Sequence, residues 1–132
     1  MSDKHIRITS AAPWESQAGY CRAVKAGNIV AVSGSASIGS DGELVGEGDM
    51  YRQTQRCIQV IEDALDKAGA SLSDVVRTRT FVTDINQWQD VARAHRDAFA
   101  AAPPATSMVE VSRLIDPRML VEIEADAIIS MD

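Results

Sequence analysis

Three carboxylates alternate with apolar residues near the C-terminal end of the chain. In the stretch 121–129, Glu122, Glu124 and Asp126 are separated by isoleucine and alanine. A period of two is typical of a strand with one buried face, so the three acids share the other face. A carboxylate held beside a ligand can position water or move a proton. Glu122 is therefore the first candidate for chemistry, and a solvated acidic face is the alternative.

Other polar residues with chemical potential stand on predicted strands. Tyr20 and Arg22 belong to one strand and Arg79 to another, while Thr106-Ser107 opens a strand directly after Pro103-Pro104. Backbone N–H groups at the start of a strand can point at a ligand, and a carboxylate opposite them would complete a small-molecule cleft. For each arginine, the alternative is an ordinary ion pair with one of the many acids.

Several familiar catalytic patterns are missing from the sequence. It contains no G-x-G-x-x-G, no Walker lysine loop, no C-x-x-C and no H-E-x-x-H. Ser33-Gly34-Ser35 follows a predicted strand but is not a G-x-S-x-G elbow. His95 and Cys57 both fall on apolar helix faces, which favours structural roles for them. The sequence therefore predicts neither a metal site nor a cofactor.

The hydrophobic pattern indicates which elements position these residues. A helix is predicted from an Asp49 cap to Ala68, ended by Gly69, and a second one over 87–101. Strands are predicted over 5–9, 20–25, 29–35 and 75–83, and two more over 104–129 are expected to form a final hairpin. Hairpin strands followed by helix, strand, helix and strands predict an α+β domain with a mixed β-sheet and two helices on one face.

The predicted helices leave the second face of the sheet uncovered. Many residues on that face are apolar, and the chain offers no further helix to cover them. An exposed apolar face of this kind is typical of a subunit interface. We therefore expect a homo-oligomer.

Length and charge restrict the class of protein further. A chain of 132 residues fits one domain, 1–132. The net charge is −6 and no Lys/Arg cluster occurs, so nucleic acid is a poor candidate partner. The start of the chain has no apolar signal region, and no run of 18 apolar residues suggests membrane insertion. With two isolated cysteines, the pattern favours a cytoplasmic protein.

Eight short motifs follow one another between residues 10 and 129. They are Tyr20-Cys21-Arg22-Ala23-Val24, Val32-Ser33-Gly34, Gln53-Thr54-Gln55, Gly69-Ala70-Ser71-Leu72-Ser73-Asp74-Val75-Val76, Phe81-Val82-Thr83-Asp84, Pro104-Ala105, Val109-Glu110-Val111 and Val121-Glu122-Ile123-Glu124-Ala125. Each motif alone is weak, whereas the ordered combination is specific. In this combination the sequence resembles the reactive intermediate deaminase family, also called Rid or YjgF.

The resemblance implies a chorismate-mutase-like (YjgF-like) α+β fold and a homotrimer with ligand clefts between neighbouring subunits. It also implies a reaction, the hydrolysis of 2-imino or enamine acids to 2-oxo acids and ammonia. In that reaction an arginine binds the substrate carboxylate and a glutamate on the last strand helps to hold water. Glu122 matches the glutamate, Tyr20 the cleft tyrosine, and Ser33-Gly34 the strand end that lines the pocket.

The sequence departs from the family pattern at the arginine. The deaminases carry Pro-Ala-Arg, and this chain has Pro104-Ala105-Thr106. Threonine cannot make a bidentate, charge-assisted contact with a carboxylate. Losing that contact costs about 1.5–3 kcal/mol, or roughly 10- to 150-fold in binding. Arg22 and Arg79 also stand where the family usually has Gln and Thr, so either cation is a candidate to receive an anionic ligand.

The sequence leaves three functions open. The first is a deaminase of imine or enamine metabolites with altered or reduced activity, in which Thr106 and Ser107 bind polar substrate groups and Tyr20 closes the pocket. The second is a non-catalytic protein that binds a small metabolite or a partner. The third, an endoribonuclease or translation inhibitor, ranks last because the charge opposes RNA binding and no general-base histidine is offered.

Overall fold

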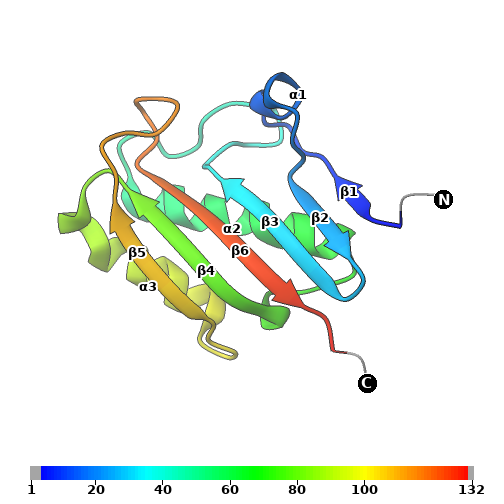
Figure 1. The fold of residues 1–132 in the computed structure, drawn as a ribbon. Coiled ribbons are helices and arrows are strands. Elements are labelled where there is room, and N and C mark those ends of the chain that lie inside the picture. Colours follow the sequence, from blue (N-terminus) through cyan, green and yellow to red (C-terminus); the bar gives the residue numbers. More distant parts are fainter. Residues whose placement is uncertain (1–3, 131–132) are drawn as a thin grey trace.

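A computed structural model describes residues 4–130 and shows one six-stranded sheet with two long helices on one face (Figure 1). The α+β class with a mixed sheet is therefore confirmed. In chain order the elements are β1 (Ile6–Ile8), α1 (Trp14–Ala18), β2 (Ala23–Ala26), β3 (Ile29–Ser35), α2 (Met50–Lys67), β4 (Val75–Val82), α3 (Trp88–Phe99), β5 (Ala105–Glu110) and β6 (Val121–Ile128), with short 3-10 turns at Leu72–Asp74 and Ile85–Gln87.

The order of strands across the sheet is β1-β2-β3-β6-β4-β5. The last strand, β6, lies between β3 and β4 and is antiparallel to both, whereas β5 pairs with β4 in parallel. The expected final hairpin of β5 and β6 is therefore wrong. The physical reason is the length of the connection 111–120, which exceeds a hairpin loop and lets the chain pass the end of β4 (Figure 1).

Helix α2 forms where its end signals and its apolar stripe agree. The Asp49 side chain accepts a hydrogen bond from the backbone N–H of Arg52 at 3.0 Å. After the helix, Gly69 has a φ of 80°, and Ala70 N–H donates to the Leu65 carbonyl, which closes the last turn. Between these ends, Cys57, Ile58, Ile61, Ala64 and Leu65 are buried in the core against the sheet. Within residues 4–130, no helix is both long and apolar enough to cross a membrane.

The two faces of β6 have opposite chemistry. Val121, Ile123, Ala125 and Ala127 are buried on the helix side, and the alternating acids lie on the open side of the sheet. On that side, Arg79 of β4 forms ion pairs with Glu124 at 3.3 Å and with Asp126 at 3.2 Å. The open face also carries Ile29 and Ile128, which are neighbours across β3 and β6 and are both about half exposed.

Candidate functional site

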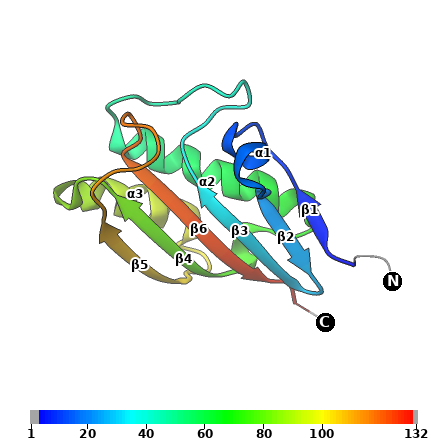
Figure 2. The same ribbon diagram turned by 45° about the horizontal axis from the view of Figure 1, so that its top comes forward.

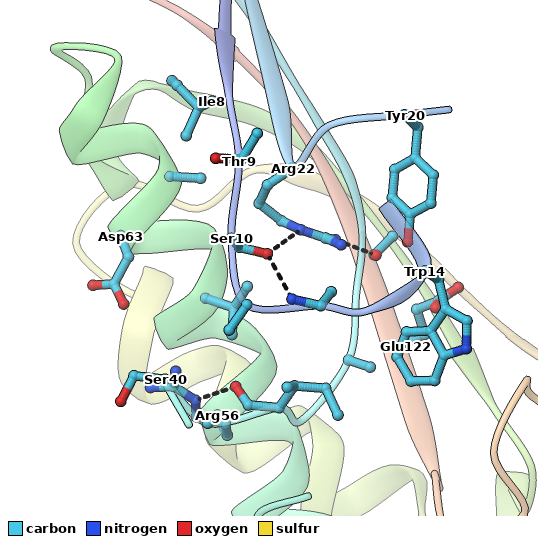
Figure 3. A pocket seen from close by; sticks show the side chains of 18 of the residues that line it. Ile8, Thr9, Ser10, Trp14, Tyr20, Arg22, Ser40, Arg56, Asp63 and Glu122 are labelled. Carbon is cyan, nitrogen blue, oxygen red and sulfur yellow. Dashed lines mark hydrogen bonds between the residues drawn. The ribbon is translucent and has the colours of Figure 1, made fainter. Parts of the chain in front are cut away.

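A cavity of about 550 Å³ opens between α2, the segment that joins β1 to α1, and the C-terminal end of β3 (Figure 3). Its polar lining includes Glu122, Tyr20 and Arg22. Its apolar lining includes Trp14 of α1 and Met119 just before β6. An apolar concavity with a few convergent polar groups is the usual form of a small-molecule site.

Gly34 makes room for the carboxylate of Glu122. A Cβ atom at position 34 would lie 2.8 Å from Oε2 of Glu122, which is closer than side-chain carbons approach an oxygen. The pairing of β3 with β6 shifts register between Val32 and Ser35, so Gly34 lies in an irregular stretch of β3. Bulges of this kind often stand beside functional sites because they redirect a strand. The glycine of the predicted pair Ser33-Gly34 thus contacts the predicted catalytic acid.

The environment of Glu122 raises the pKa of its carboxyl group. Partial burial is the main cause, because it disfavours the charged form, and Glu124 adds a smaller repulsion. Arg22 acts in the opposite direction by attraction. A carboxyl group with a raised pKa takes up and releases a proton closer to neutral pH, which suits general acid–base chemistry.

Arg22 lies deep in the wall of the cavity. It is only 3% exposed, and it forms an ion pair with Glu15 of α1 at 3.3 Å. Its guanidinium also donates to the carbonyl of Gly34 and lies 5.7 Å from the centroid of the Tyr20 ring. The predicted alternative, an ion pair with an acid, therefore applies to Arg22, but the acid is buried with it instead of lying on the surface.

The remaining predicted site residues lie outside this cavity. The Thr78 hydroxyl donates to Thr106 Oγ1 at 2.7 Å and contacts His95 Nε2 at 2.9 Å, so Thr106 faces the helix layer. Ser107 is the strand neighbour of Arg79 on β5 and β4. Ser33 lies beside the cavity wall, where its hydroxyl donates to the carbonyl of Cys21 at 2.8 Å.

Within one chain, four of the predicted site residues line the same cavity, namely Tyr20, Arg22, Gly34 and Glu122. Thr106, Ser107 and Arg79 lie on the other half of the sheet, on β5 and β4. Figure 3 shows Tyr20, Trp14 and Glu122 on one side of the cavity, with Arg22 and Ser10 between them and Asp63 of α2.

Two residues next to the predicted site were not singled out from the sequence, namely Trp14, which lines the cavity, and Glu15, which pairs with Arg22. Both belong to α1, a helix of five residues in a stretch that reads as loop. Such a helix is too short to produce a hydrophobic period. The available signal was Gly19, which ends α1 with a φ of 75° as a C-terminal glycine does.

No group of three histidine, cysteine, aspartate or glutamate side chains is placed to hold a metal ion among residues 4–130. The cavity lining carries carboxyl, hydroxyl and aromatic groups together with the basic side chains of Arg22, Arg56 and Lys67. The two histidines do not line it.

Comparison with known proteins identifies relatives over nearly the whole chain. The family described as Endoribonuclease L-PSP matches residues 9–129. A RutC family protein of Pyrococcus abyssi is 40% identical over 110 residues, which are 82% of this chain and 84% of the relative. The 3-aminoacrylate deaminase RutC of Acinetobacter baylyi is 34% identical over 108 residues, covering 82% of this chain and 85% of the relative.

The crystal structure of Rv2704 from Mycobacterium tuberculosis, a member of the YjgF/YER057c/UK114 family, has the same fold. It superposes with a TM-score of 0.87 at 45% sequence identity, covering 96% of this chain and 100% of that one. The expected YjgF-like fold is therefore confirmed.

Proposed function

Because this chain belongs to the Endoribonuclease L-PSP family, also called Rid or YjgF, we propose that it is a hydrolytic deaminase of imine or enamine metabolites. The observation that carries the proposal is the half-buried carboxyl group of Glu122, which lines the cavity opposite Gly34 and has a raised pKa. The name of the Acinetobacter relative, a 3-aminoacrylate deaminase, supports the same substrate class.

In the proposed reaction, water adds to the carbon of the C=N bond of an imine. The water oxygen forms the new C–O bond, the C–N bond then breaks, and the products are a 2-oxo compound and ammonia. The Glu122 carboxylate accepts a proton from the attacking water and passes it to the nitrogen, which gives a carbinolamine. As the C–N bond breaks, the carboxylate moves the hydroxyl proton of the carbinolamine to the departing nitrogen in the same way, and the C=O bond forms. Trp14 and Tyr20 supply aromatic wall around the reacting carbon, which limits access of bulk water.

This protein is expected to differ from the deaminases of the family in the way it binds a substrate carboxylate. Thr106 offers no charge, Arg22 is buried against Glu15, and Arg79 is paired with two acids of β6. We therefore propose altered or reduced activity on 2-imino acids. Without the arginine contact of the family's deaminases, binding of their carboxylate is expected to be about 10- to 150-fold weaker. Thr106 and Ser107 would bind polar substrate groups by hydroxyl hydrogen bonds instead.

The proposal includes a homotrimer, in which clefts lie between neighbouring subunits. Thr106 and Ser107 lie on the edge strand β5, at a distance along the sheet from the cavity of their own chain. A neighbouring subunit whose cavity adjoins β5 would bring Thr106 close to a second Glu122. The half-exposed isoleucines on the open face support burial of that face between subunits.

The proposal is tested by imines generated in situ with an amino-acid oxidase. We expect the wild-type protein to accelerate release of 2-oxo acid above the spontaneous rate for at least one substrate. The Glu122→Gln variant keeps the size of the side chain but cannot accept the proton, so it should return to the spontaneous rate. No acceleration with any imine, or full activity of Glu122→Gln, would contradict the proposal.

A non-catalytic metabolite-binding protein is the alternative, favoured by the same cavity and by the uncharged Thr106. If turnover is absent, a thermal shift with 2-oxo acids that disappears in Glu122→Gln would support it. RNA cleavage is disfavoured, because the net charge is −6 and no histidine lines the cavity within residues 4–130.

A further inference from the structure

The guanidinium of Arg22 joins three separate segments. Nη2 reaches Glu15 of α1 at 3.3 Å, and Nε donates to the Ser10 hydroxyl at 3.3 Å. Nη1 donates to the carbonyl of Gly34 and to Ser35 Oγ in β3, the latter at 3.3 Å. Arg22 therefore links α1 and the segment before it to the irregular end of β3.

Glu15 takes part in the same cluster of hydrogen bonds around Arg22 and Ser10. It is 6% exposed, and Oε1 accepts a hydrogen bond from the backbone N–H of Ser10 at 3.1 Å. Its Oε2 accepts from the Ser10 hydroxyl as well as from Arg22. Its backbone carbonyl accepts from the N–H groups of Gly19 and Tyr20, so the turn that leads to Tyr20 depends on the position of Glu15.

A buried ion pair of this kind is a weak source of stability. Removing two charges from water costs several kcal/mol, and their attraction only offsets that cost. An apolar pair of similar size would stabilise the fold about as well. The position of the pair therefore suggests a role for it beyond stability.

We propose that Arg22 and Glu15 form a positioning pair for the Glu122 site, in which Arg22 does not bind substrate. The pair holds α1, and with it Trp14 and Tyr20, against the stretch of β3 that contains Gly34. Gly34 is the residue that leaves space for the Glu122 carboxylate. In Figure 3, Arg22 lies between Ser10 and the side of the cavity with Tyr20 and Trp14. This inference rests on the proposed function only in taking the Glu122 cavity as the ligand site.

The pair also places a positive charge near Glu122. Arg22 lowers the pKa of the Glu122 carboxyl group, against the larger effect of burial. The other charged and titratable groups around Glu122 include Glu124 on β6, the Cys57 thiol on α2 and the Tyr20 phenol. Arg56, Asp63 and Lys67 of α2 line the same cavity. Glu15 is paired with Arg22. Glu15 and Arg22 carry opposite charges. Removing Arg22 and removing Glu15 should therefore change the electrostatic potential at Glu122 in opposite directions.

Measurement of the Glu122 pKa by carbon NMR, with glutamate labelled at the carboxyl carbon, tests the proposal without requiring turnover. Arg22→Met leaves the buried Glu15 charge and should raise the pKa of Glu122. Glu15→Gln leaves the Arg22 charge and should lower it. The double variant removes both charges, so its Glu122 pKa should lie between the values of the two single variants. Arg93→Met, which breaks an exposed ion pair with Asp90, should leave it unchanged and is the matched control.

No shift in either single variant would overturn the proposal, because breaking a pair that holds α1 against β3 has to change the surroundings of the Glu122 carboxyl group. If Arg22→Met does not fold, Arg22→Lys keeps the charge and should retain a pKa of Glu122 near that of the wild type, while Glu15→Gln still has to lower it. If the wild type hydrolyses no imine but the opposite shifts appear, the proposed function fails and the positioning pair stands.

Discussion

At the scale of single residues, the site depends on the contact between a glycine and a carboxylate. Glu122 lines the cavity because buried and more exposed side chains alternate along β6, and because Gly34 has no side chain to block the carboxylate. The alternation was readable in the sequence. The contact with Gly34 was not, because it arises from a register shift between two strands that are far apart in the chain.

Gly34→Ala tests that contact. Gly34 does not have a positive φ, so alanine fits the backbone, but its Cβ would stand 2.8 Å from Oε2 of Glu122. We expect displacement of the carboxylate and a loss of imine hydrolysis on the order of 10²-fold. Steady-state kinetics measures this loss of imine hydrolysis. If Gly34 acts through Glu122, the double variant Gly34→Ala/Glu122→Gln should have nearly the same activity as Glu122→Gln alone. Losses of activity that add independently in the double variant would contradict the contact.

Glu122→Gln should also change stability, with a defined pH dependence. The folded protein holds the Glu122 proton more tightly than the unfolded chain, since the pKa of the carboxyl group is raised from about 4.5 by burial. The favourable contribution is fully present below that unfolded value and is lost as the pH rises through the folded pKa. Glutamine cannot ionise, so the variant should be more stable than the wild type at pH 7.

Denaturant unfolding at pH 4 and pH 7 measures this effect. The gain in unfolding free energy of Glu122→Gln should be larger at pH 7 and should shrink towards pH 4. Glu62→Gln on α2, for which no such burial applies, is a suitable control. If the gain in unfolding free energy of Glu122→Gln is equal at both pH values, the carboxylate is solvated in the folded state.

At the scale of elements, local signals predicted the two long helices, α2 and α3, whereas long-range pairing decided the order of the strands. Asp49 and Gly69 bracket α2, so its ends were readable from neighbouring residues. The position of β6 between β3 and β4 was not, because alternation indicates which residues share a face but not which strand lies beside them. The same limit explains why Thr106 was expected near Glu122, although one chain places it on the edge strand β5.

Thr106→Arg tests what the position of β5 means for ligand binding. An arginine at the edge of the sheet can extend towards the cavity of a neighbouring subunit and bind a substrate carboxylate. We expect hydrolysis of 2-aminoacrylate-type substrates to rise, with carboxylate binding about 10- to 150-fold tighter. Thr106→Met is the matched control, because it also loses the hydrogen bond from Thr78 but adds no charge. Equal activity of the two variants would mean that the cavity has diverged beyond this position.

At the scale of the whole molecule, the open face of the sheet makes a prediction about assembly. Figure 2 shows α2 and α3 behind the sheet, with the opposite face uncovered along β3, β6 and β4. Ile29 and Ile128 are cross-strand neighbours on that face, 50% and 47% exposed. Exposed apolar side chains that lie together on one face can mark a subunit interface.

We expect sedimentation velocity to give the mass of three chains at micromolar concentration. Ile128→Lys places a charge in the proposed interface and should shift the protein to a single chain. Trp88→Lys changes a residue of similar exposure on α3, on the other side of the molecule, and should leave the trimer intact. A wild-type protein that sediments as one chain would remove the inter-subunit cleft from the proposal.

The most direct test of the Glu122 site is a crystal structure of the protein with a bound 2-oxo acid, the expected product. We expect the ligand to occupy the cavity beside Trp14 and Tyr20, with an oxygen at hydrogen-bond distance from the Glu122 carboxyl group. Arg22 should still be paired with Glu15 in that complex. A ligand bound elsewhere, or bound directly by Arg22 with Glu122 turned away, would contradict this expectation.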